Sequence, residues 1–236
     1  MNDFIRIVSY NIQSGNGMDH VYNVPRTAAA INRLNPDAVG LQEVRIYADR
    51  PGDGDIPAIL NEQTGLTAHF GLAISFPSFE YGIGILSRYP SEVVEKIELP
   101  CVPGTEQRVA LVTKIRHPAK EFFLITTHFS FERGFEAVRL EQMKTILETV
   151  RAKHYAPAVL TGDLNAVPAE PCVRELAKDW TVADTEKPTF NSADPSVQID
   201  YIAWYPGDAF RLKDYLVADE RLASDHRPVL ADLIPC

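Results

Sequence analysis

The sequence predicts an α/β sandwich in which two mostly antiparallel sheets pack face to face and helices cover the outside. Short apolar stretches of strand length recur along the chain and outnumber the helical patterns, which favours packed sheets over a helix bundle. Helices alternate with strands in the first half of the chain, and strands dominate later. The 236 residues contain no repeat and no Gly/Ser-rich linker, so we expect a single domain over residues 1–236.

Eight stretches have the length and composition of strands. The first, FIRIVSY, alternates apolar and polar residues along its length. The second, DAVGLQ, is short and apolar, as expected for a buried strand. In chain order, the expected strands cover residues 4–10, 37–42, 82–87, 108–115, 121–129, 157–162, 198–204 and 227–233.

Three stretches are predicted to be helical. Residues 25–34 begin with proline, which fits the first turn of a helix, and stop before an Asn-Pro pair. Residues 56–65 end at Gly65, which can take the left-handed conformation that follows a last helical turn. Residues 134–152 place apolar side chains on one face, namely Met143, Ile146, Leu147 and Val150.

The charge of the chain argues against a long nucleic-acid duplex as its partner. Lysine and arginine together number 23 and aspartate and glutamate 32, so the formal net charge is −9 at pH 7. Proteins that bind long duplexes usually carry a basic stripe, and the sequence has no cluster of lysines and arginines. A phosphodiester substrate remains compatible with this charge, because a bound divalent cation reverses the local sign. We therefore expect a small or locally bound substrate.

The composition and the first residues predict a cytoplasmic protein without a stable membrane insertion. No apolar run approaches the ~18 residues of a membrane span. The opening MNDFIRIVSY lacks the basic and apolar regions of a secretory signal. The three cysteines are odd in number and far apart, which is typical of unpaired thiols in a reducing compartment.

Polar residues follow or begin strand after strand, and this shared position predicts a functional site. Taken singly, each has a common structural explanation, such as an aspartate in a turn or an asparagine that caps a loop. Side chains at the ends of several strands, however, are brought together when the strands pack, and they form a site on a rigid scaffold. The candidates are Asn11, Glu43, His128, Asp163, Asn165, Asp200, Asp225 and His226.

The chemistry of these candidates favours a metal-assisted reaction. They comprise four acids, two histidines and two asparagines, without a serine or cysteine nucleophile beside a base, a glycine-rich phosphate loop or a histidine pair at zinc spacing. Oxygen ligands of this kind favour Mg²⁺ or Mn²⁺ over zinc. Because Mg²⁺ typically takes one or two carboxylates, the other acids remain to orient a histidine or a water. The set is suited to metal-assisted attack of water on a phosphoester.

Seven short motifs in order resemble those of the endonuclease/exonuclease/phosphatase superfamily, which has the deoxyribonuclease I-like fold. They are SYNIQ (9–13), PDAVGLQE (36–43), YGIGILSRYP (81–90), TTHF (126–129), GDLNA (162–166), IDYI (199–202) and SDHRPV (224–229). A single motif of this kind is weak evidence for a family, but seven motifs in order over more than 200 residues are specific evidence. Arg108 resembles the arginine that often follows the third motif. The resemblance implies a four-layer αββα sandwich with the site at one edge of the sheets.

The resemblance also implies a metal ligand and a group that activates water. Glu43 would hold the divalent metal, with Asn11 beside it and Asp225 as a further or second-metal ligand. Asp163 and Asn165 would orient and activate the attacking water and contact the phosphoryl oxygens.

The two histidines receive roles from the same resemblance. Asp200 would accept a hydrogen bond from His226 and fix its tautomer. His226 would contact the scissile phosphate or act as base, so that either Asp163 or His226 takes the proton. His128 would contact the phosphate and assist the leaving group.

Aromatic residues beside these motifs are candidates for substrate contacts. We expect two loops, 75–81 and 129–136, and in them Phe79 and Phe131 could form a stacking or apolar wall. Packing of the rings beneath the loops is an equal alternative. Arg108 and Arg133 could contact the substrate phosphate, although Arg133 could equally be solvated at the surface.

Arg139 lies on the apolar face of the third predicted helix, where a charged group requires a partner. Two arrangements would satisfy it. Arg139 could brace the catalytic loops through a carboxylate or carbonyl group, or it could extend to solvent at the helix start. Bracing is the favoured interpretation.

The predicted function is a Mg²⁺- or Mn²⁺-dependent phosphodiesterase that cleaves P–O bonds by direct attack of water. A nuclease acting on nucleic acid is the default for the family that the sequence resembles. The first alternative is a hydrolase of a small or lipid-linked phosphoester, similar to sphingomyelinases or inositol phosphatases. The second is a non-catalytic binding module on the same fold, which would have lost some of the acids or histidines.

Overall fold

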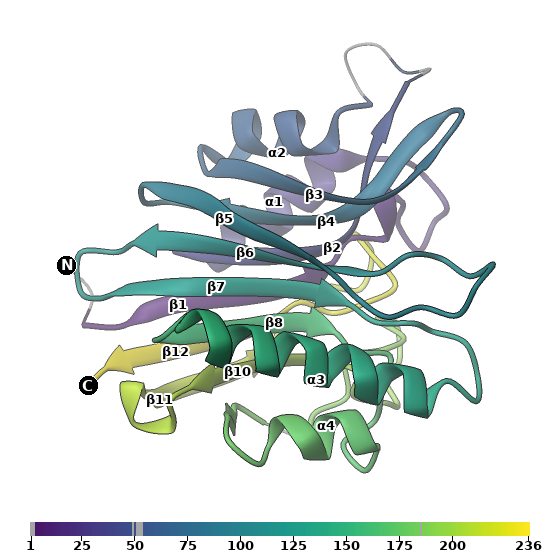
Figure 1. Cartoon of the computed structure of the whole chain (residues 1–236). Helices are drawn as coiled ribbons and strands as arrows, with labels where there is room; N and C mark the ends of the chain where they lie inside the picture. Colours follow the sequence, from purple (N-terminus) through teal and green to yellow (C-terminus); the bar gives the residue numbers. More distant parts are fainter. Residues whose placement is uncertain (1–2, 49, 51–53, 185) are drawn as a thin grey trace.

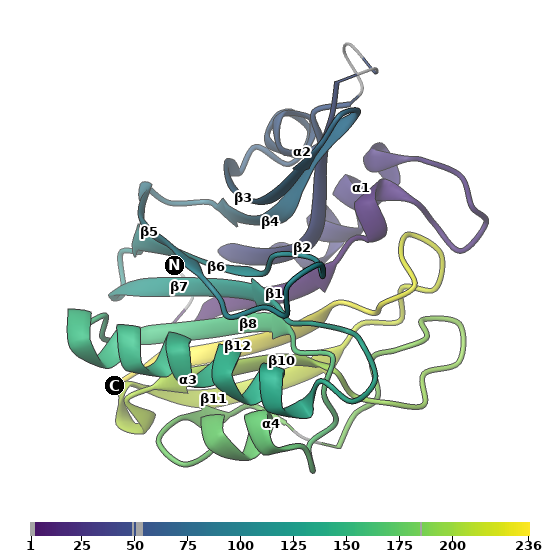
Figure 2. The ribbon, with the colours of Figure 1, turned by 45° about the vertical axis from the view of Figure 1, so that its right-hand side comes forward.

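The computed structural model describes residues 3–48, 50, 54–184 and 186–236. Two six-stranded sheets pack face to face, and helices cover their two outer faces (Figures 1 and 2). This arrangement is the predicted four-layer sandwich. None of the helices in the described part of the chain combines the length and the apolar character needed to cross a membrane.

The first sheet has the strand order β11-β12-β1-β2-β4-β3 and the second the order β5-β6-β7-β8-β10-β9. Each sheet has one parallel pair, β1 with β2 and β7 with β8, and its other pairs are antiparallel. The strands of the first sheet are β1 (Ile5–Asn11), β2 (Ala38–Tyr47), β3 (Thr67–Phe76), β4 (Phe79–Ser87), β11 (Phe210–Val217) and β12 (Val229–Pro235). Those of the second are β5 (Ser91–Glu98), β6 (Val109–Arg116), β7 (Glu121–His128), β8 (Ala158–Asp163), β9 (Thr181–Val182) and β10 (Asp200–Tyr205).

The three predicted helices end within one residue of their expected ends, whereas the short helix α4 (Pro171–Leu176) was not predicted. Asn23 caps the first by accepting a hydrogen bond from the Arg26 backbone N–H, and Gly65 follows the second in the left-handed conformation with φ +70°. The helices are α1 (Val24–Leu34), α2 (Ile56–Thr64), α3 (Glu136–Lys153) and α4 (Pro171–Leu176), with 3-10 turns η1 (Gln13–Gly15) and η2 (Gly207–Ala209).

Three layers of apolar side chains hold the four layers of backbone together. One lies between α1, α2 and the first sheet and contains Ile31 and Leu60. The middle layer lies between the sheets and contains Ile7 and Leu124. The third lies between the second sheet and α3 and α4, and it contains Met143. The apolar face predicted for the third helix is therefore buried as expected.

The strands that the sequence did not reveal are the edge strands of both sheets. β3, β5, β9 and β11 are edge strands, and most of their residues are half-buried or exposed. An edge strand has less surface to bury, so its sequence carries a weaker apolar signal. The expected loop 75–81 is wrong, because Phe76 ends β3, Phe79 begins the interior strand β4, and only residues 77–78 form the turn.

The strand directions bring the predicted polar residues to one edge. β1 ends at Asn11, which lies opposite Gln42 of the parallel β2, and β2 continues past the bulge at Glu43 to Tyr47. β7 and β8 are also parallel and end with His128 opposite Asp163. β10 runs antiparallel to β8, so its first residue, Asp200, lies opposite Asp163. Three strand ends and one strand start of the two sheets therefore meet at the same place.

The two sheets approach each other closely near this edge. Gly40 in β2 leaves no room for a side chain, since a Cβ atom there would lie 2.0 Å from the Thr161 hydroxyl of β8. Two residues further along β2, the Gln42 amide donates a 3.0 Å hydrogen bond to the Thr126 hydroxyl of β7. This contact joins the sheets directly beneath the strand ends and fixes their separation.

Arg139 braces two loops, as the favoured interpretation predicted. Its side chain is only 3% exposed. The guanidinium donates to the Glu170 carboxylate at 2.8 and 3.1 Å and to the carbonyl oxygens of Ser130 and Glu132 at 3.1 and 3.2 Å. Both carbonyls belong to the loop that follows His128, so α3 holds this loop in place.

Replacing Arg139 by leucine should lower the free energy of unfolding by roughly 3 kcal/mol, because Glu170 and two carbonyl groups lose their donor. Denaturant titration followed by circular dichroism measures the loss. Arg151→Leu is the matched control, since Arg151 lies on the same helix and its pair with Asp179 is exposed; we expect less than about 1 kcal/mol there. Equal losses in the two variants would show that Arg139 has no bracing role.

Candidate active site

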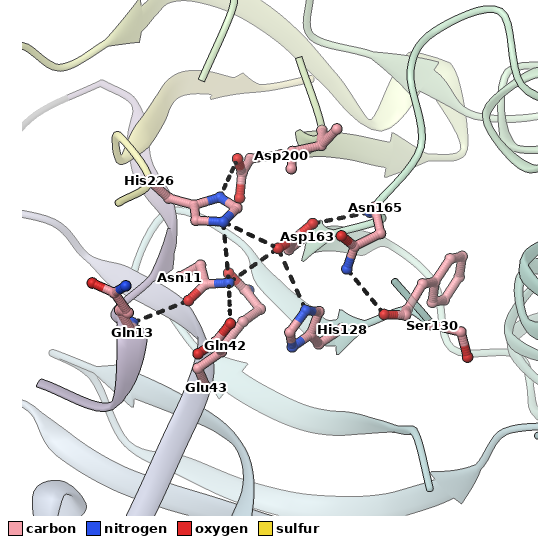
Figure 3. A network of polar contacts seen from close by, with 12 residues as sticks. Asn11, Gln13, Gln42, Glu43, His128, Ser130, Asp163, Asn165, Asp200 and His226 are labelled. Atoms are coloured by element: carbon pink, nitrogen blue, oxygen red, sulfur yellow. Dashed lines mark hydrogen bonds and ion pairs between the residues drawn. The ribbon is translucent and has the colours of Figure 1, made fainter. Parts of the chain in front are cut away.

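A polar cavity of about 300 Å³ opens at the edge where the strand ends meet. Its walls include most of the residues predicted from the sequence. These are Glu43, Arg108, His128, Phe131, Asp163, Asn165, Asp225 and His226. Asn11 and Asp200 lie behind this wall and are buried. Figure 3 shows how the side chains of the two sheets converge.

Asn11 is at the centre of the polar network. Its amide nitrogen lies 3.1 Å from a Glu43 carboxylate oxygen, 3.0 Å from Asp163 Oδ2 and 3.5 Å from His226 Nε2 (Figure 3). Its amide oxygen accepts a hydrogen bond from the Gln13 backbone N–H, which sets the orientation of the amide group. Asn11 therefore turns its donor side towards two carboxylates and holds them close together.

Strained backbone positions aim two of the site residues. Glu43 has φ +57° and lies at a bulge where the pairing of β2 with β4 shifts between Leu41 and Val44. Asn165 has φ +48°, and its backbone N–H donates to Asp163 Oδ1 at 2.9 Å. A side chain in the left-handed region costs of order 1–3 kcal/mol, and such strain clusters at functional sites. Both deviations turn polar groups into the cavity.

His226 is held by a buried carboxylate. Its Nδ1 lies 2.9 Å from Asp200 Oδ2, which also accepts a 2.6 Å hydrogen bond from the Thr189 hydroxyl. Burial opposes the charged imidazolium, but the carboxylates of Asp200 and Asp163 outweigh it and raise the pKa of His226 to about 10. Nδ1 therefore faces Asp200, and Nε2 is directed towards Asp163, at 3.5 Å.

Asp163 is shared by both histidines. Its Oδ2 lies 3.4 Å from His128 Nε2 and 3.5 Å from His226 Nε2. Burial raises the pKa of Asp163 to about 7, against the opposing effect of His226. Burial, together with the positive charges of Arg108 and His226, holds the pKa of His128 well below its usual value. One imidazole is therefore charged and the other neutral at pH 7, which divides the acid and base roles between them.

Glu43 and Asp225 are suited to hold a divalent cation. Burial and the nearby Asp225 carboxylate raise the pKa of Glu43, whereas the Asn11 amide lowers it. Within the described residues, no lysine or arginine forms an ion pair with either carboxylate. Two oxygen ligands that face one cavity without a balancing cation have the chemistry that Mg²⁺ prefers.

A second group, of two aspartates and a histidine, could also hold a cation. Asp163, Asp200 and His226 each place one ligand atom within 4.8 Å of the others. The atoms of this buried group are already occupied, however, because Asp200 accepts hydrogen bonds from His226 and Thr189. Glu43 and Asp225 each accept one side-chain hydrogen bond as well, from Asn11 and Ser224, but both line the open cavity and remain candidate ligands.

Two predicted substrate-binding residues lie away from the cavity. Phe79 packs against Phe76 in a tilted arrangement with ring centroids 4.6 Å apart, and the Arg45 guanidinium lies 4.4 Å above its ring. Residues 75–81 form a hairpin of β3 and β4 rather than a loop at the cavity, which places Phe79 two residues beyond Tyr81 towards the turn. Arg133 is exposed and forms no ion pair with any residue that the structure describes. The structure does not bring either side chain to the site.

Sequence reasoning missed several residues of the cavity. Glu106 pairs with Arg108 at 2.9 Å, and burial raises its pKa. Phe190 packs against His226 with ring centroids 4.9 Å apart, and Thr189 holds Asp200. These residues lie in irregular segments without periodicity. The one available signal was the position of Glu106, two residues before Arg108.

The sequence profile of the Endonuclease/Exonuclease/phosphatase family matches residues 8–226. The chain belongs to this family. As the name of the family says, it comprises nucleases and phosphatases, which are hydrolases of phosphoesters. All seven motifs that indicated the resemblance begin and end inside the matched region or within three residues of its end.

Similar proteins agree with this assignment. The chain is 28% identical over 171 residues to Protein angel of Drosophila melanogaster, covering 66% of this chain and 47% of that protein. It therefore spans about half the length of that relative. A structure of an endonuclease/exonuclease/phosphatase from Beutenbergia cavernae is 27% identical with a TM-score of 0.82, covering 98% of this chain and 72% of the other. A mannosyl-6-phosphatase from Bacteroides thetaiotaomicron shares the fold at 19% identity, with a TM-score of 0.76 and coverage of 98% and 99%.

Replacing Asp200 by asparagine should lower the pKa of His226 by roughly 1–3 pH units, because the variant removes the carboxylate that faces Nδ1. Titration of the imidazole proton resonances by NMR, without added metal, measures this change. His69 is the internal control, since it is half-buried in β3 and bonds Ser91 instead. An unchanged His226 titration would mean that Asp200 does not set the charge of the imidazole.

Proposed function

We propose that this protein is a Mg²⁺- or Mn²⁺-dependent phosphodiesterase of the nuclease type, acting in the cytoplasm by direct attack of water on phosphorus. The observation that carries this proposal is the position of Asp163 Oδ2. It lies within 3.5 Å of both His128 and His226, in a cavity whose wall also carries Glu43 and Asp225. One carboxylate is thus placed to activate water beside two acids that suit a cation.

The cavity wall supports direct attack by water. Its described lining contains no serine, threonine or cysteine that could form a covalent intermediate. Tyr81 does line it, but burial raises the pKa of its hydroxyl well above the usual value, so the phenolate nucleophile does not form at pH 7. We take water as the nucleophile, and Asp163 is the cavity residue whose pKa, about 7, suits a general base.

The two histidines complement this base. His226, held by Asp200, presents a positive charge that stabilises the negative charge developing on the phosphoryl oxygens. His128 is neutral and contacts the phosphoryl group or the departing oxygen through Nε2. Asn165 orients Asp163 through its backbone N–H and keeps its own side chain bonded to the Phe129 carbonyl.

Glu43 and Asp225 are the residues that would hold the metal, with Asn11 positioning Glu43. The chemistry that a bound divalent cation supplies is polarisation of the phosphoryl group and neutralisation of its charge. Arg108, which is buried beside the cavity, adds a fixed positive charge that can contact the substrate phosphate. Phe131 lies at the mouth, 61% exposed, where its ring can flank the substrate.

A small phosphoester is the second candidate substrate. The cavity of about 300 Å³ accommodates a phosphoryl group with a compact substituent, and the net charge of −9 does not favour a long polyanion. The mannosyl-6-phosphatase with the same fold shows that this architecture carries a phosphatase acting on a sugar phosphate. A lipid-linked phosphoester belongs to the same class, with its head group in the cavity.

Hydrolysis of three substrates tests the proposal. Bis(p-nitrophenyl) phosphate, single-stranded DNA and plasmid DNA are each incubated with Mg²⁺, with Mn²⁺ and with chelator. We expect hydrolysis to require metal. The rate should fall by about 10²–10⁴-fold in His226→Ala, because the variant removes the positive charge that stabilises the phosphoryl oxygens.

The pattern of substrates then separates the candidates. Cleavage of DNA as well as the aryl diester supports a nuclease, whereas cleavage of the aryl diester alone supports the small phosphoester. Arg116→Gln is the control, since this exposed arginine pairs with Glu92 at the far end of β6. Chelator-resistant hydrolysis, or equal activity in His226→Ala and wild type, would contradict the proposal.

A further inference from the structure

A row of arginines and aromatic rings extends from the cavity along β2 and the β3–β4 hairpin. We refer to it as the arginine–aromatic ladder, and its members are Tyr22, Arg45, Tyr47, Arg50, Phe76 and Phe79. In Figure 2 the end of β2 and the paired strands β3 and β4 rise together, away from β6 and β7. The strand directions place this rising part at the same edge as the cavity, because β2 ends and β4 begins there.

The rings and guanidinium groups alternate in space. The Arg50 guanidinium lies 4.5 Å from the ring centroids of both Tyr22 and Tyr47. The Arg45 guanidinium lies 4.4 Å from Phe79 and 5.9 Å from Tyr47. Beyond Phe79, the ring of Phe76 follows at 4.6 Å. These distances are those of cation–π and aromatic contacts.

The register of the sheet explains this alternation. Arg45 lies opposite Tyr81, and Tyr47 lies opposite Phe79. Residues two apart in a strand share one face, so these four side chains lie together on the same side of the first sheet. Because Tyr81 also lines the cavity and its ring lies 5.4 Å from the Arg45 guanidinium, the ladder begins at the cavity wall.

The charges of the ladder are not neutralised. Within the described part of the chain, neither Arg45 nor Arg50 forms an ion pair with a carboxylate, and the one polar contact of the Arg45 head group is a 3.5 Å approach to the Tyr47 hydroxyl. Arg26, Arg108 and Arg139, in contrast, each pair with a carboxylate within 3.0 Å. A guanidinium stacked on a ring still directs its N–H groups outward, where they can donate to an anion.

Flat apolar rings beside unpaired guanidinium groups match one class of ligand. Single-stranded nucleic acid offers base faces that stack on aromatic rings and phosphates that pair with arginine. A duplex hides its base faces, and a small phosphoester does not extend beyond the cavity. Phe76 is 42% exposed at the far end of the ladder and offers an accessible ring. Because the whole chain carries a net charge of −9, only the arginines of this surface attract the phosphates, and the protein as a whole does not.

We propose that the arginine–aromatic ladder is a binding track for single-stranded nucleic acid. The track passes the strand along Arg50, Arg45 and Phe79 to Tyr81 and the cavity. That the bound strand is then cut rests on the proposed function, whereas binding to the ladder requires neither metal nor hydrolysis. The ladder thereby selects single strands by contacts outside the catalytic cavity.

Fluorescence anisotropy in chelator measures binding apart from cleavage. The probe is a fluorescein-labelled oligodeoxythymidine of about 12 nucleotides, compared with a dinucleotide and with a duplex of equal length. The test variant is the double substitution Arg45→Gln and Arg50→Gln. Its matched control is Arg116→Gln with Arg151→Gln, which changes the net charge equally at two exposed arginines away from the ladder.

The ladder variant should bind the long single strand at least about tenfold more weakly than wild type and with a shallower salt dependence. The slope of log Kd against log salt should fall by about 1.4, that is about 0.7 for each lost phosphate contact. The control should change the affinity less than about twofold. Phe76→Ala should weaken binding of the single strand, because it removes a stacking ring.

Three results would overturn the track. They are equal losses in the ladder variant and its control, equal affinity for duplex and single strand, or absence of binding by the wild-type protein. Thermal melting checks that each variant is folded, and Arg50→Gln alone replaces the double variant if Arg45→Gln does not fold. Absence of single-strand binding by a wild-type protein that still hydrolyses an aryl diester with metal would count against the track alone, whereas binding without any metal-dependent hydrolysis would count against the proposed function alone.

Discussion

The amide group of Asn11 holds the carboxylates of Glu43 and Asp163 close together, and the rest of the site is arranged around that contact. Asn11 is fully buried, its oxygen is fixed by the Gln13 N–H, and its backbone carbonyl accepts a 2.7 Å hydrogen bond from the Ser224 hydroxyl. One neutral amide offsets the repulsion between the buried Asp163 and the half-buried Glu43 carboxylates only in part. The remaining negative charge is what makes this edge of the sandwich suited to a cation. The family to which the chain belongs hydrolyses phosphoesters, for which such a cation is an effective catalyst.

The surroundings of Asp163 separate the two histidines that contact it. Both Nε2 atoms lie within 3.5 Å of the same carboxylate oxygen, yet their charges differ. His226 has Asp200 behind it, and Asp200 is in turn held by Thr189, so the imidazolium is stabilised in spite of its burial. The part of the structure that surrounds His128 has no such carboxylate behind Nδ1, and the nearby positive charges keep it neutral. Two identical side chains thus acquire different chemistry from what lies behind them.

The sequence predicted the sandwich and most of the site, because both follow from where strands end. The paired segments of parallel strands end at the same edge, so Asn11 and Glu43, like His128 and Asp163, converge once the strands are recognised. Arg139 was recognisable as buried, since it interrupts an apolar face with helical periodicity. Edge strands were missed because little of their surface is buried. Phe79 was placed in a loop at the cavity because both the edge strand β3 and the first residues of β4 went unrecognised. Glu106, Thr189 and Phe190 lie in irregular segments, where only the folded chain shows which side chains meet. The cross-strand partners of Arg45 likewise depend on a register that no local pattern encodes.

Binding of Mn²⁺ to the protein without substrate tests most directly whether the carboxylates at this edge hold a cation. Electron paramagnetic resonance gives the affinity for wild type, Glu43→Gln and Glu106→Gln at one pH. Both glutamates line the same cavity, but Glu106 is paired with Arg108, whereas Glu43 faces Asp225 without an ion pair among the described residues. The site described here predicts that Glu43→Gln weakens Mn²⁺ binding by at least about tenfold and that Glu106→Gln leaves it nearly unchanged. Equal affinity in Glu43→Gln and wild type would contradict it.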